Sequence, residues 1–207
     1  MTQFASATPA LAAALLTDPF YQAITVDQGV DTSGRLALLC KYFEYSLQEA
    51  DRAGRCVFHE DPTLGAAAWL LPRAPDLEAA EARAKTEFLA RLLGPKGWDN
   101  YRRIIDFMSA QSERLVPAEA WYLTIVGIDP GAQGRGSGAK LLAPTLAEAE
   151  AAGIYTFLET FSPRNLTFYE RLGFVRVADF LEPTTQSRYF IMGCRPKTVT
   201  RAATAPR

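Results

Sequence analysis

The chain has 207 residues, of which 48% are hydrophobic and 22% are charged, and its formal net charge at pH 7 is −1. This composition predicts a soluble globular protein with a sizeable core, and the near-zero charge argues against nucleic-acid or acidic-membrane partners. No apolar run approaches the roughly 18 residues of a membrane span, and residues 1–13 lack the basic and apolar regions of a secretory leader, so we expect a cytoplasmic protein.

The first half of the chain is predicted to be mostly helical. Residues 10–16 are rich in alanine and leucine and stop at Asp18-Pro19, which predicts a short first helix because the residue before a proline disfavours the helical conformation. Residues 2–5 are the available place for an initial strand. A polar loop follows, and apolar residues then recur at helical spacing over residues 33–53. Before residue 120 we further expect antiparallel strands at 56–60 and 66–71 and helices at 77–92 and 98–115.

The second half alternates strands and helices. A hydrophobic strand is predicted at 121–128, and a helix at 136–151 follows it. Pro144 lies inside that helix, where an interior proline costs about 3 kcal/mol, and we expect a tolerated kink. The chain then reads as a strand at 155–160, a helix at 163–172, and strands at 174–181 and 187–193. We expect one domain, residues 1–194, followed by a flexible basic tail, residues 195–207.

The connection between residues 128 and 136 is rich in glycine. Glycines let a backbone approach an anion without Cβ clashes, and the N–H groups at a helix start face outward, where the helix dipole adds roughly half a positive charge. The turn therefore predicts a phosphate site built from the backbone of Gln133, Gly134, Arg135, Gly136, Ser137 and Gly138. Arg135 adds a positive side chain that faces either the phosphates or solvent.

Two other interpretations of this turn are excluded, one by spacing and one by context. A P-loop needs a hydroxyl residue after its lysine, but Lys140 precedes Leu141. A dinucleotide-binding fingerprint fits formally at Gly134, Gly136 and Ala139, with Glu159 about twenty residues beyond. However, only 48 residues follow Glu159, which are too few to complete two mononucleotide-binding halves.

The turn and a later segment together resemble one family. Gln133, Gly136 and Gly138 reproduce a Q/R-x-x-G-x-G/A signature, and residues 159–174 read ETFSPRNLTFYERLGF. In this order and about thirty residues apart, the two segments resemble motifs A and B of the GNAT superfamily of N-acetyltransferases. Residues 157–174 are most similar to the puromycin N-acetyltransferases within it. The resemblance is strong from residue 121 to 192 and weak before that.

This resemblance implies an α/β fold with a central, mostly antiparallel sheet flanked by helices, and acetyl-CoA as co-substrate without a metal. It further implies that cofactor-binding residues are Val126, Gly127, Ile128, Asn165 and Phe168. The resemblance also implies that Tyr169 is the general acid beside the sulfur of coenzyme A, and a packing role is its alternative. Asn165 could instead secure the start of its helix. Gly127, inside a strand, is expected to mark a bulge or a close approach.

Glu159 is the only charged residue in the run 155–161, which reads as a buried strand. Burial without a partner would raise its pKa toward that of a base able to deprotonate an ammonium group. Three roles stay open for Glu159: catalytic base, anchor of a substrate amine, or partner of an arginine in a structural salt bridge. His59, the only histidine, is expected to be a solvated loop residue.

The resemblance predicts an enzyme that moves an acetyl group from acetyl-CoA to the amine of a small molecule, aromatic or aminonucleoside-like. Direct transfer is favoured, because no cysteine lies in either motif; Cys40, Cys56 and Cys194 also form no metal-ligand motif. The alternatives are acetylation of a protein lysine or N-terminus, and a non-catalytic acyl-CoA sensor. The sequence leaves a homodimer open. Candidate walls of an acceptor pocket are the aromatic residues Phe20, Tyr21, Tyr42, Tyr45, Trp98, Tyr101, Trp121 and Tyr122.

Overall fold

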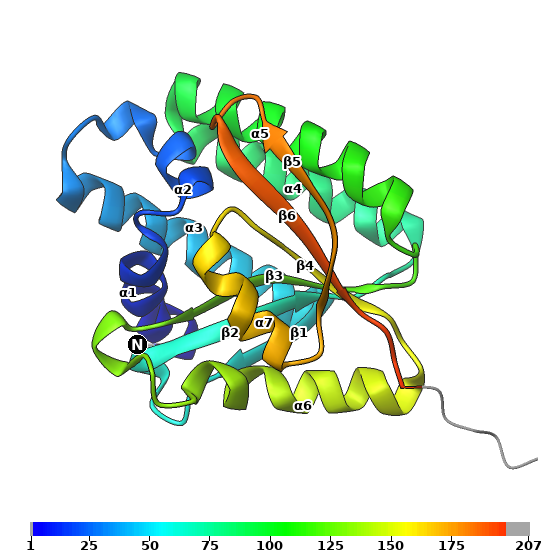
Figure 1. The fold of residues 1–207 in the computed structure, drawn as a ribbon. Helices are drawn as coiled ribbons and strands as arrows, with labels where there is room; N and C mark the ends of the chain where they lie inside the picture. The colour runs from blue at the N-terminus through cyan, green and yellow to red at the C-terminus, as the bar shows by residue number, and fades with distance from the viewer. Residues whose placement is uncertain (1, 198–207) are drawn as a thin grey trace, which may run out of the picture.

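A computed structural model describes residues 2–197, and within them six strands form one sheet in the order β1-β2-β3-β4-β6-β5 (Figure 1). β3 and β4 pair in parallel, and the other neighbours pair antiparallel, so the sheet is mixed and mostly antiparallel, as predicted. The strands are β1 (Gly54–Phe58), β2 (Gly65–Leu70), β3 (Trp121–Ile128), β4 (Thr156–Thr160), β5 (Val175–Glu182) and β6 (Ser187–Cys194).

Helices cover both faces of this sheet (Figure 1). The α-helices are α1 (Gln3–Leu15), α2 (Pro19–Ile24), α3 (Thr32–Ala53), α4 (Pro75–Leu92), α5 (Gly94–Leu115), α6 (Ser137–Ala152) and α7 (Leu166–Arg171). Short 3₁₀ turns occur at Val26–Gln28, Pro62–Leu64, Pro130–Ala132 and Pro163–Asn165. The parallel pair β3 and β4 is joined through α6, because parallel strands need a crossover connection.

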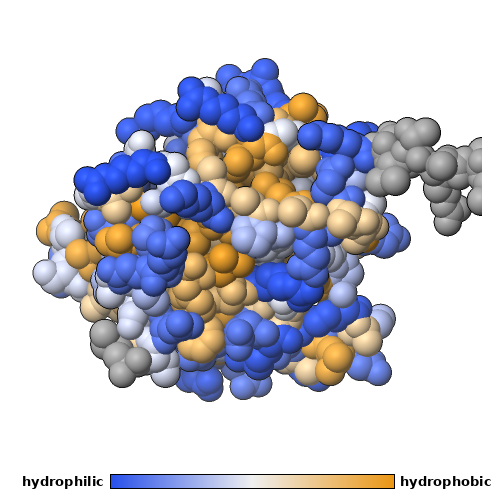
Figure 2. All heavy atoms as spheres, turned by 90° about the horizontal axis from the view of Figure 1, so that it is seen from below, coloured by the Kyte–Doolittle hydropathy of each residue, from blue (hydrophilic) through white to orange (hydrophobic). Residues whose placement is uncertain are grey.

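The alternation of side chains along β2 divides the core into two clusters. Ala66 and Ala68 pack with buried residues of α1, α3 and α5 on one face, and Ala67 and Trp69 pack with residues of α6 and α7 on the other. Figure 2 views the molecule from the side of α6 and shows a band of apolar side chains between hydrophilic ones. The sheet therefore has an apolar layer on each of its two faces.

The predicted first helix, residues 10–16, was too short. α1 begins at Gln3, so residues 2–5 do not form a strand, and the helix continues through Pro9 to Leu15. Thr2 caps it, accepting a hydrogen bond from the N–H of Ala5 at 3.3 Å. Pro9 lacks the N–H that would bond the carbonyl of Ala5, and the hydroxyl of Thr8 donates to that carbonyl instead, at 3.1 Å. The expected polar loop also contains a helix, α2.

The other elements agree with the sequence within a few residues. β3 has the predicted bounds, and α6 runs through Pro144 without ending, as expected. The expected helix at 163–172 is a 3₁₀ turn followed by α7. Of the predicted basic tail, residues 198–207 lie outside the described residues. No helix within residues 2–197 is long and apolar enough to cross a membrane.

Candidate active site

The central feature of the site is the separation of β3 from β4. The two strands pair only from Trp121 to Leu123, opposite Thr156 to Leu158, whereas β3 continues to Ile128 with β2 alone as its partner. The remaining backbone of β3 therefore has groups available on the β4 side for a ligand to pair with. Val126, Gly127 and Ile128 lie on this segment.

A bulge marks the point of separation. The register between β2 and β3 shifts between Ala68 and Trp69, which leaves Thr124 without a partner residue in β2. The hydroxyl of Thr124 donates to the carbonyl of Ala68 at 3.2 Å. The bulge thus lies at Thr124 and not at Gly127. Gly127 instead permits close packing, since a Cβ there would lie 2.8 Å from Cδ2 of Leu11 in α1.

The glycine-rich turn is held against the end of β3. The side-chain amide of Gln133 donates to the carbonyl of Ile128 at 2.9 Å. Gly134 and Gly136 have φ of +79° and +80°, a region that favours glycine, and a Cβ at either position would meet no atom within 4 Å. Gly136 is the N-cap of α6, so the free N–H groups of the first turn of that helix start here. The turn has the open, backbone-lined form expected of a phosphate site.

Three further turn residues differ in surroundings. Arg135 is exposed, and Ser137 is the first residue of α6. A Cβ at Gly138 would lie 3.1 Å from Cζ of Phe168, so this glycine allows the ring of Phe168 in α7 to approach α6. Phe168 therefore supports the turn by packing, in addition to its predicted place beside the cofactor.

The second motif brings two predicted residues to one cavity. Asn165 and Tyr169 both line it, and the Tyr169 side chain is buried. Burial raises the pKa of Tyr169, and the negative charge of Asp18 raises it further. Tyr169 is therefore protonated at neutral pH and can donate a hydrogen bond or a proton into the cavity.

Glu159 enters the same cavity from β4. The hydroxyl of Tyr122 donates to its Oε2 at 2.6 Å, and the hydroxyl of Tyr189 donates to its Oε1. Burial raises the pKa of Glu159, and the two tyrosine hydrogen bonds oppose that rise. The salt bridge to an arginine, one of the roles left open for Glu159, is wrong, because none of the ion pairs within residues 2–197 includes this carboxylate.

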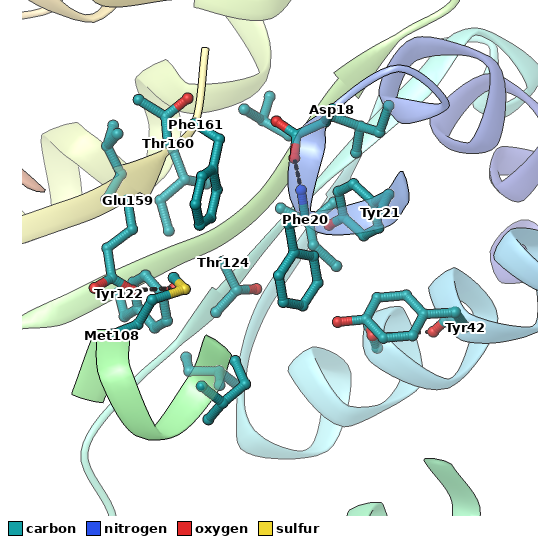
Figure 3. A pocket seen from close by; sticks show the side chains of 18 of the residues that line it. Asp18, Phe20, Tyr21, Tyr42, Met108, Tyr122, Thr124, Glu159, Thr160 and Phe161 are labelled. Atoms are coloured by element: carbon teal, nitrogen blue, oxygen red, sulfur yellow. Dashed lines mark hydrogen bonds between the residues drawn. The ribbon is translucent and has the colours of Figure 1, made fainter. Parts of the chain in front are cut away.

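The cavity has a volume of about 160 Å³ and lies between β3, β4 and the helices α2 to α5 (Figure 3). Five of the eight aromatic candidates line it, namely Phe20, Tyr21, Tyr42, Tyr101 and Tyr122. Tyr45, Trp98 and Trp121 do not. A cavity of about 150 Å³ holds a benzene-sized molecule. The space therefore fits about one aromatic ring.

Sequence reasoning missed two charged features of the cavity. Asp18 lines it, and burial raises the pKa of this carboxyl from its ordinary 3.8 to about 6, against hydrogen bonds from the N–H groups of Phe20 and Tyr21. Glu49 of α3 and Lys85 of α4 also line the cavity and form an ion pair of 2.7 Å with each other. Asp18-Pro19 was interpreted as a helix stop, but an aspartate before proline is equally the N-cap signal of the next helix.

His59 lies outside the cavity, at the connection of β1 and β2, where its Nδ1 accepts from the N–H of Asp61 at 3.1 Å. It is the loop residue that was predicted. The part of the chain that the structure describes contains no group of three or more His, Cys, Asp or Glu side chains placed to hold a metal ion.

Comparisons with known proteins agree with this architecture. Residues 98–176, which include β3, the turn and α7, match the family of acetyltransferase (GNAT) domains. The chain is similar to the crystal structure of histone acetyltransferase HPA2 and related acetyltransferase from Corynebacterium glutamicum, with 24% identity and a TM-score of 0.63 over 95% of this chain and 93% of that one.

Two insect enzymes are also similar. Arylalkylamine N-acetyltransferase 2 from Aedes aegypti has 13% identity and a TM-score of 0.63, covering 94% of each chain. Polyamine N-acetyltransferase from Drosophila melanogaster has 14% identity and a TM-score of 0.53, covering 91% of this chain and 94% of that one. At such identities the likeness establishes the fold, which is that of the GNAT acetyltransferases, and the substrate has to be inferred from the site.

Proposed function

We propose that this protein transfers an acetyl group from acetyl-CoA to the amine of a small aromatic molecule, within a ternary complex. The observation that carries the proposal is the gap between β3 and β4, because it joins the glycine-rich turn to the cavity that holds Glu159 and Tyr169. A cofactor lying along β3 would reach the turn with its phosphates and the cavity with its thioester.

The backbone would hold most of this cofactor. Val126, Gly127 and Ile128 offer N–H and C=O groups to the pantetheine amides, in the manner of an added strand. The N–H groups at the start of α6, where Gly136 opens the turn, receive the pyrophosphate. Asn165 lines the cavity where the two parts meet, and a hydrogen bond from it to the pantetheine arm fits that place.

The reacting groups would meet inside the cavity. Tyr169, kept protonated by burial, supplies the proton that the thiolate of coenzyme A needs as it leaves. Glu159 receives the ammonium of the acceptor, because an opposite charge compensates a carboxylate that is buried without a cation. None of Cys40, Cys56 and Cys194 lines the cavity, which favours direct transfer over an acyl-cysteine intermediate.

The shape and charge of the cavity favour a cationic amine with one aromatic ring. Its walls combine aromatic side chains with the carboxylates of Asp18, Glu49 and Glu159, against one cation, Lys85. A volume of about 160 Å³ leaves most of an aminonucleoside such as puromycin outside. Activity on arylalkylamines and polyamines in proteins of the same fold supports a small amine.

The helices α4 and α5 also disfavour a protein substrate. Lys85 of α4 and Tyr101, Ile105 and Met108 of α5 line the cavity, so these two helices restrict the room for a peptide. A non-catalytic sensor would not need an acid and a carboxylate in one cavity, and Tyr169 and Glu159 both lie there.

Release of free coenzyme A tests the proposal. The protein would be supplied with acetyl-CoA and, in separate reactions, phenethylamine, tryptamine, agmatine, spermidine, puromycin or a lysine-containing peptide, and the new thiol would be measured. We expect the fastest release with the two arylalkylamines. Release with the peptide alone would favour a protein substrate. Binding of acetyl-CoA without release in any reaction would favour the sensor.

A further inference from the structure

We propose that Asp18 is the catalytic residue that accepts the proton of the substrate ammonium, so that Glu159 anchors the amine and Asp18 activates it. This inference rests on the proposed function and adds a second carboxylate to the acceptor side of the same site.

The position of Asp18 is fixed by local structure. It is the N-cap of α2, and its Oδ1 accepts a hydrogen bond from the N–H of Phe20 at 2.9 Å. Oδ2 forms no side-chain hydrogen bond and no ion pair within residues 2–197. In Figure 3 this second oxygen points to the side of the cavity on which Thr160 and Phe161 lie. One oxygen thus orients the carboxylate, and the other is available to a substrate.

Asp18 lines the same cavity as the predicted general acid. Its negative charge raises the pKa of Tyr169 and that of Tyr21, so protonation of Asp18 and the acidity of Tyr169 are coupled electrostatically. Acetyl transfer needs a proton acceptor at the nitrogen and a proton donor at the sulfur, on two sides of one thioester carbonyl. Asp18 and Tyr169 line one cavity from two different elements, as those roles require.

The other groups around the cavity leave Asp18 without a cation. The ionisable side chains that line it come from each of the surrounding elements, and they are Tyr21 of α2, Tyr42 and Glu49 of α3, Lys85 of α4, Tyr101 of α5, Tyr122 of β3, Glu159 of β4 and Tyr169 of α7. The single cation among them, Lys85, is paired with Glu49 at 2.7 Å. A substrate ammonium is therefore the natural counter-charge of Asp18.

The two carboxylates differ in what holds them. Both oxygens of Glu159 accept hydrogen bonds from tyrosine hydroxyls, which stabilise its charged form and oppose the rise in its pKa that burial causes. Asp18 accepts only backbone N–H groups within the described residues, and burial raises its pKa to about 6. A base of this pKa is ionised at neutral pH and still takes a proton readily.

The proton and bond changes balance as follows. The ammonium gives one proton to Oδ2 of Asp18, and the neutral nitrogen forms the C–N bond at the thioester carbonyl. The C–S bond then breaks, and the thiolate takes the proton of the Tyr169 hydroxyl. The second proton lost by the nitrogen restores Tyr169, and Asp18 returns its proton to solvent. The sum is an amide, coenzyme A and one released proton.

Asp18→Asn removes the negative charge and keeps the cap of α2, because asparagine caps a helix as well as aspartate does. The matched control is Asp31→Asn. Asp31 is the N-cap of α3, accepts from the N–H of Ser33 at 3.0 Å, and lies outside the cavity. Coenzyme A release with the best amine of the panel would be followed from pH 5 to 9 for both variants, the wild type and Glu159→Gln.

We expect kcat/KM of the wild type to fall below about pH 6 as Asp18 becomes protonated. Asp18→Asn should lower kcat by roughly 10² to 10⁴ at neutral pH. Its pH–rate profile should lack the acidic limb, which is the fall in kcat/KM below about pH 6, and its activity should recover at high pH, where the amine is already neutral. Asp31→Asn should match the wild type. Glu159→Gln should raise KM for the amine and keep the acidic limb.

Two results would overturn the inference while leaving the proposed function intact. One is an active wild type beside an Asp18→Asn variant with the same rate and the same acidic limb. The other is loss of that limb in Glu159→Gln instead, which would make Glu159 the base. A wild type that releases no coenzyme A with any amine would overturn the proposed function and this inference together.

Discussion

Asp18→Asn should stabilise the folded protein at neutral pH, although it removes a residue of the proposed site. The folded state raises the pKa of this carboxyl from 3.8 to about 6, so folding disfavours its charged form. Each pKa unit corresponds to about 1.4 kcal/mol, which makes the cost up to about 3 kcal/mol above pH 6. Asparagine carries no charge and keeps the cap, so the variant avoids that cost.

The stability gained by Asp18→Asn should depend on pH. The destabilising contribution is complete above the folded pKa of about 6 and vanishes below the unfolded value of 3.8, where both states bind the proton. We therefore expect Asp18→Asn to gain about 6 to 12 °C in Tm at pH 7.5, since 1 kcal/mol shifts Tm by about 2–4 °C in a chain of this size. The gain should shrink toward zero near pH 4.

Differential scanning calorimetry of the wild type, Asp18→Asn and Asp31→Asn at pH 7.5 and pH 4.5 measures this directly. Asp31 has the same capping role on the exposed start of α3, so its variant should stay close to the wild type at both pH values. The reasoning would be refuted if Asp18→Asn were no more stable than the wild type at pH 7.5. An equal gain at both pH values would also refute it, because the gain would then not come from charge.

Two further predictions concern the cofactor side. Gly136→Ala and Gly153→Ala each place a methyl group at one end of α6, where φ is +80° and +70° and no atom lies within 4 Å of the new Cβ. Each variant should lose about 1 kcal/mol of stability, because both positions have left-handed backbone. Only Gly136→Ala should weaken acetyl-CoA binding, and equal affinities of the two variants in calorimetric titration would show that the turn is not the phosphate site. Tyr169→Phe removes one hydroxyl and should lower kcat by roughly 10² to 10⁴ while acetyl-CoA affinity is kept, so an unchanged kcat would remove Tyr169 from the acid role.

Much of the fold was predictable because local patterns and packing agree. β3 is a hydrophobic run bounded by a glycine-rich turn, and its bounds were predicted residue for residue. α6 begins at that turn and tolerates Pro144. The start of α1 was missed, because Pro9 argues against a helix and the compensating hydrogen bond from Thr8 to Ala5 is a property of the folded backbone.

The candidate site was predictable where a motif carries it and not where distant segments meet. The turn from Gln133 to Gly138 and the residues of α7 could be named from spacing. The tyrosine partners of Glu159 could not, because Tyr122 and Tyr189 lie 37 and 30 residues away and reach it only through sheet pairing. Asp18 was missed for the same reason: its place in one cavity with Tyr169 depends on how α1 packs on β3 and how α2 packs on α5.

The structure of the protein bound to acetyl-CoA tests the central claim most directly. The account predicts that the pantetheine lies along β3 beside Val126 to Ile128, that the pyrophosphate contacts backbone N–H groups between Gln133 and Gly138, and that the thioester sulfur lies within hydrogen-bonding distance of the Tyr169 hydroxyl. A cofactor bound away from the gap between β3 and β4, or a sulfur out of reach of Tyr169, would contradict it.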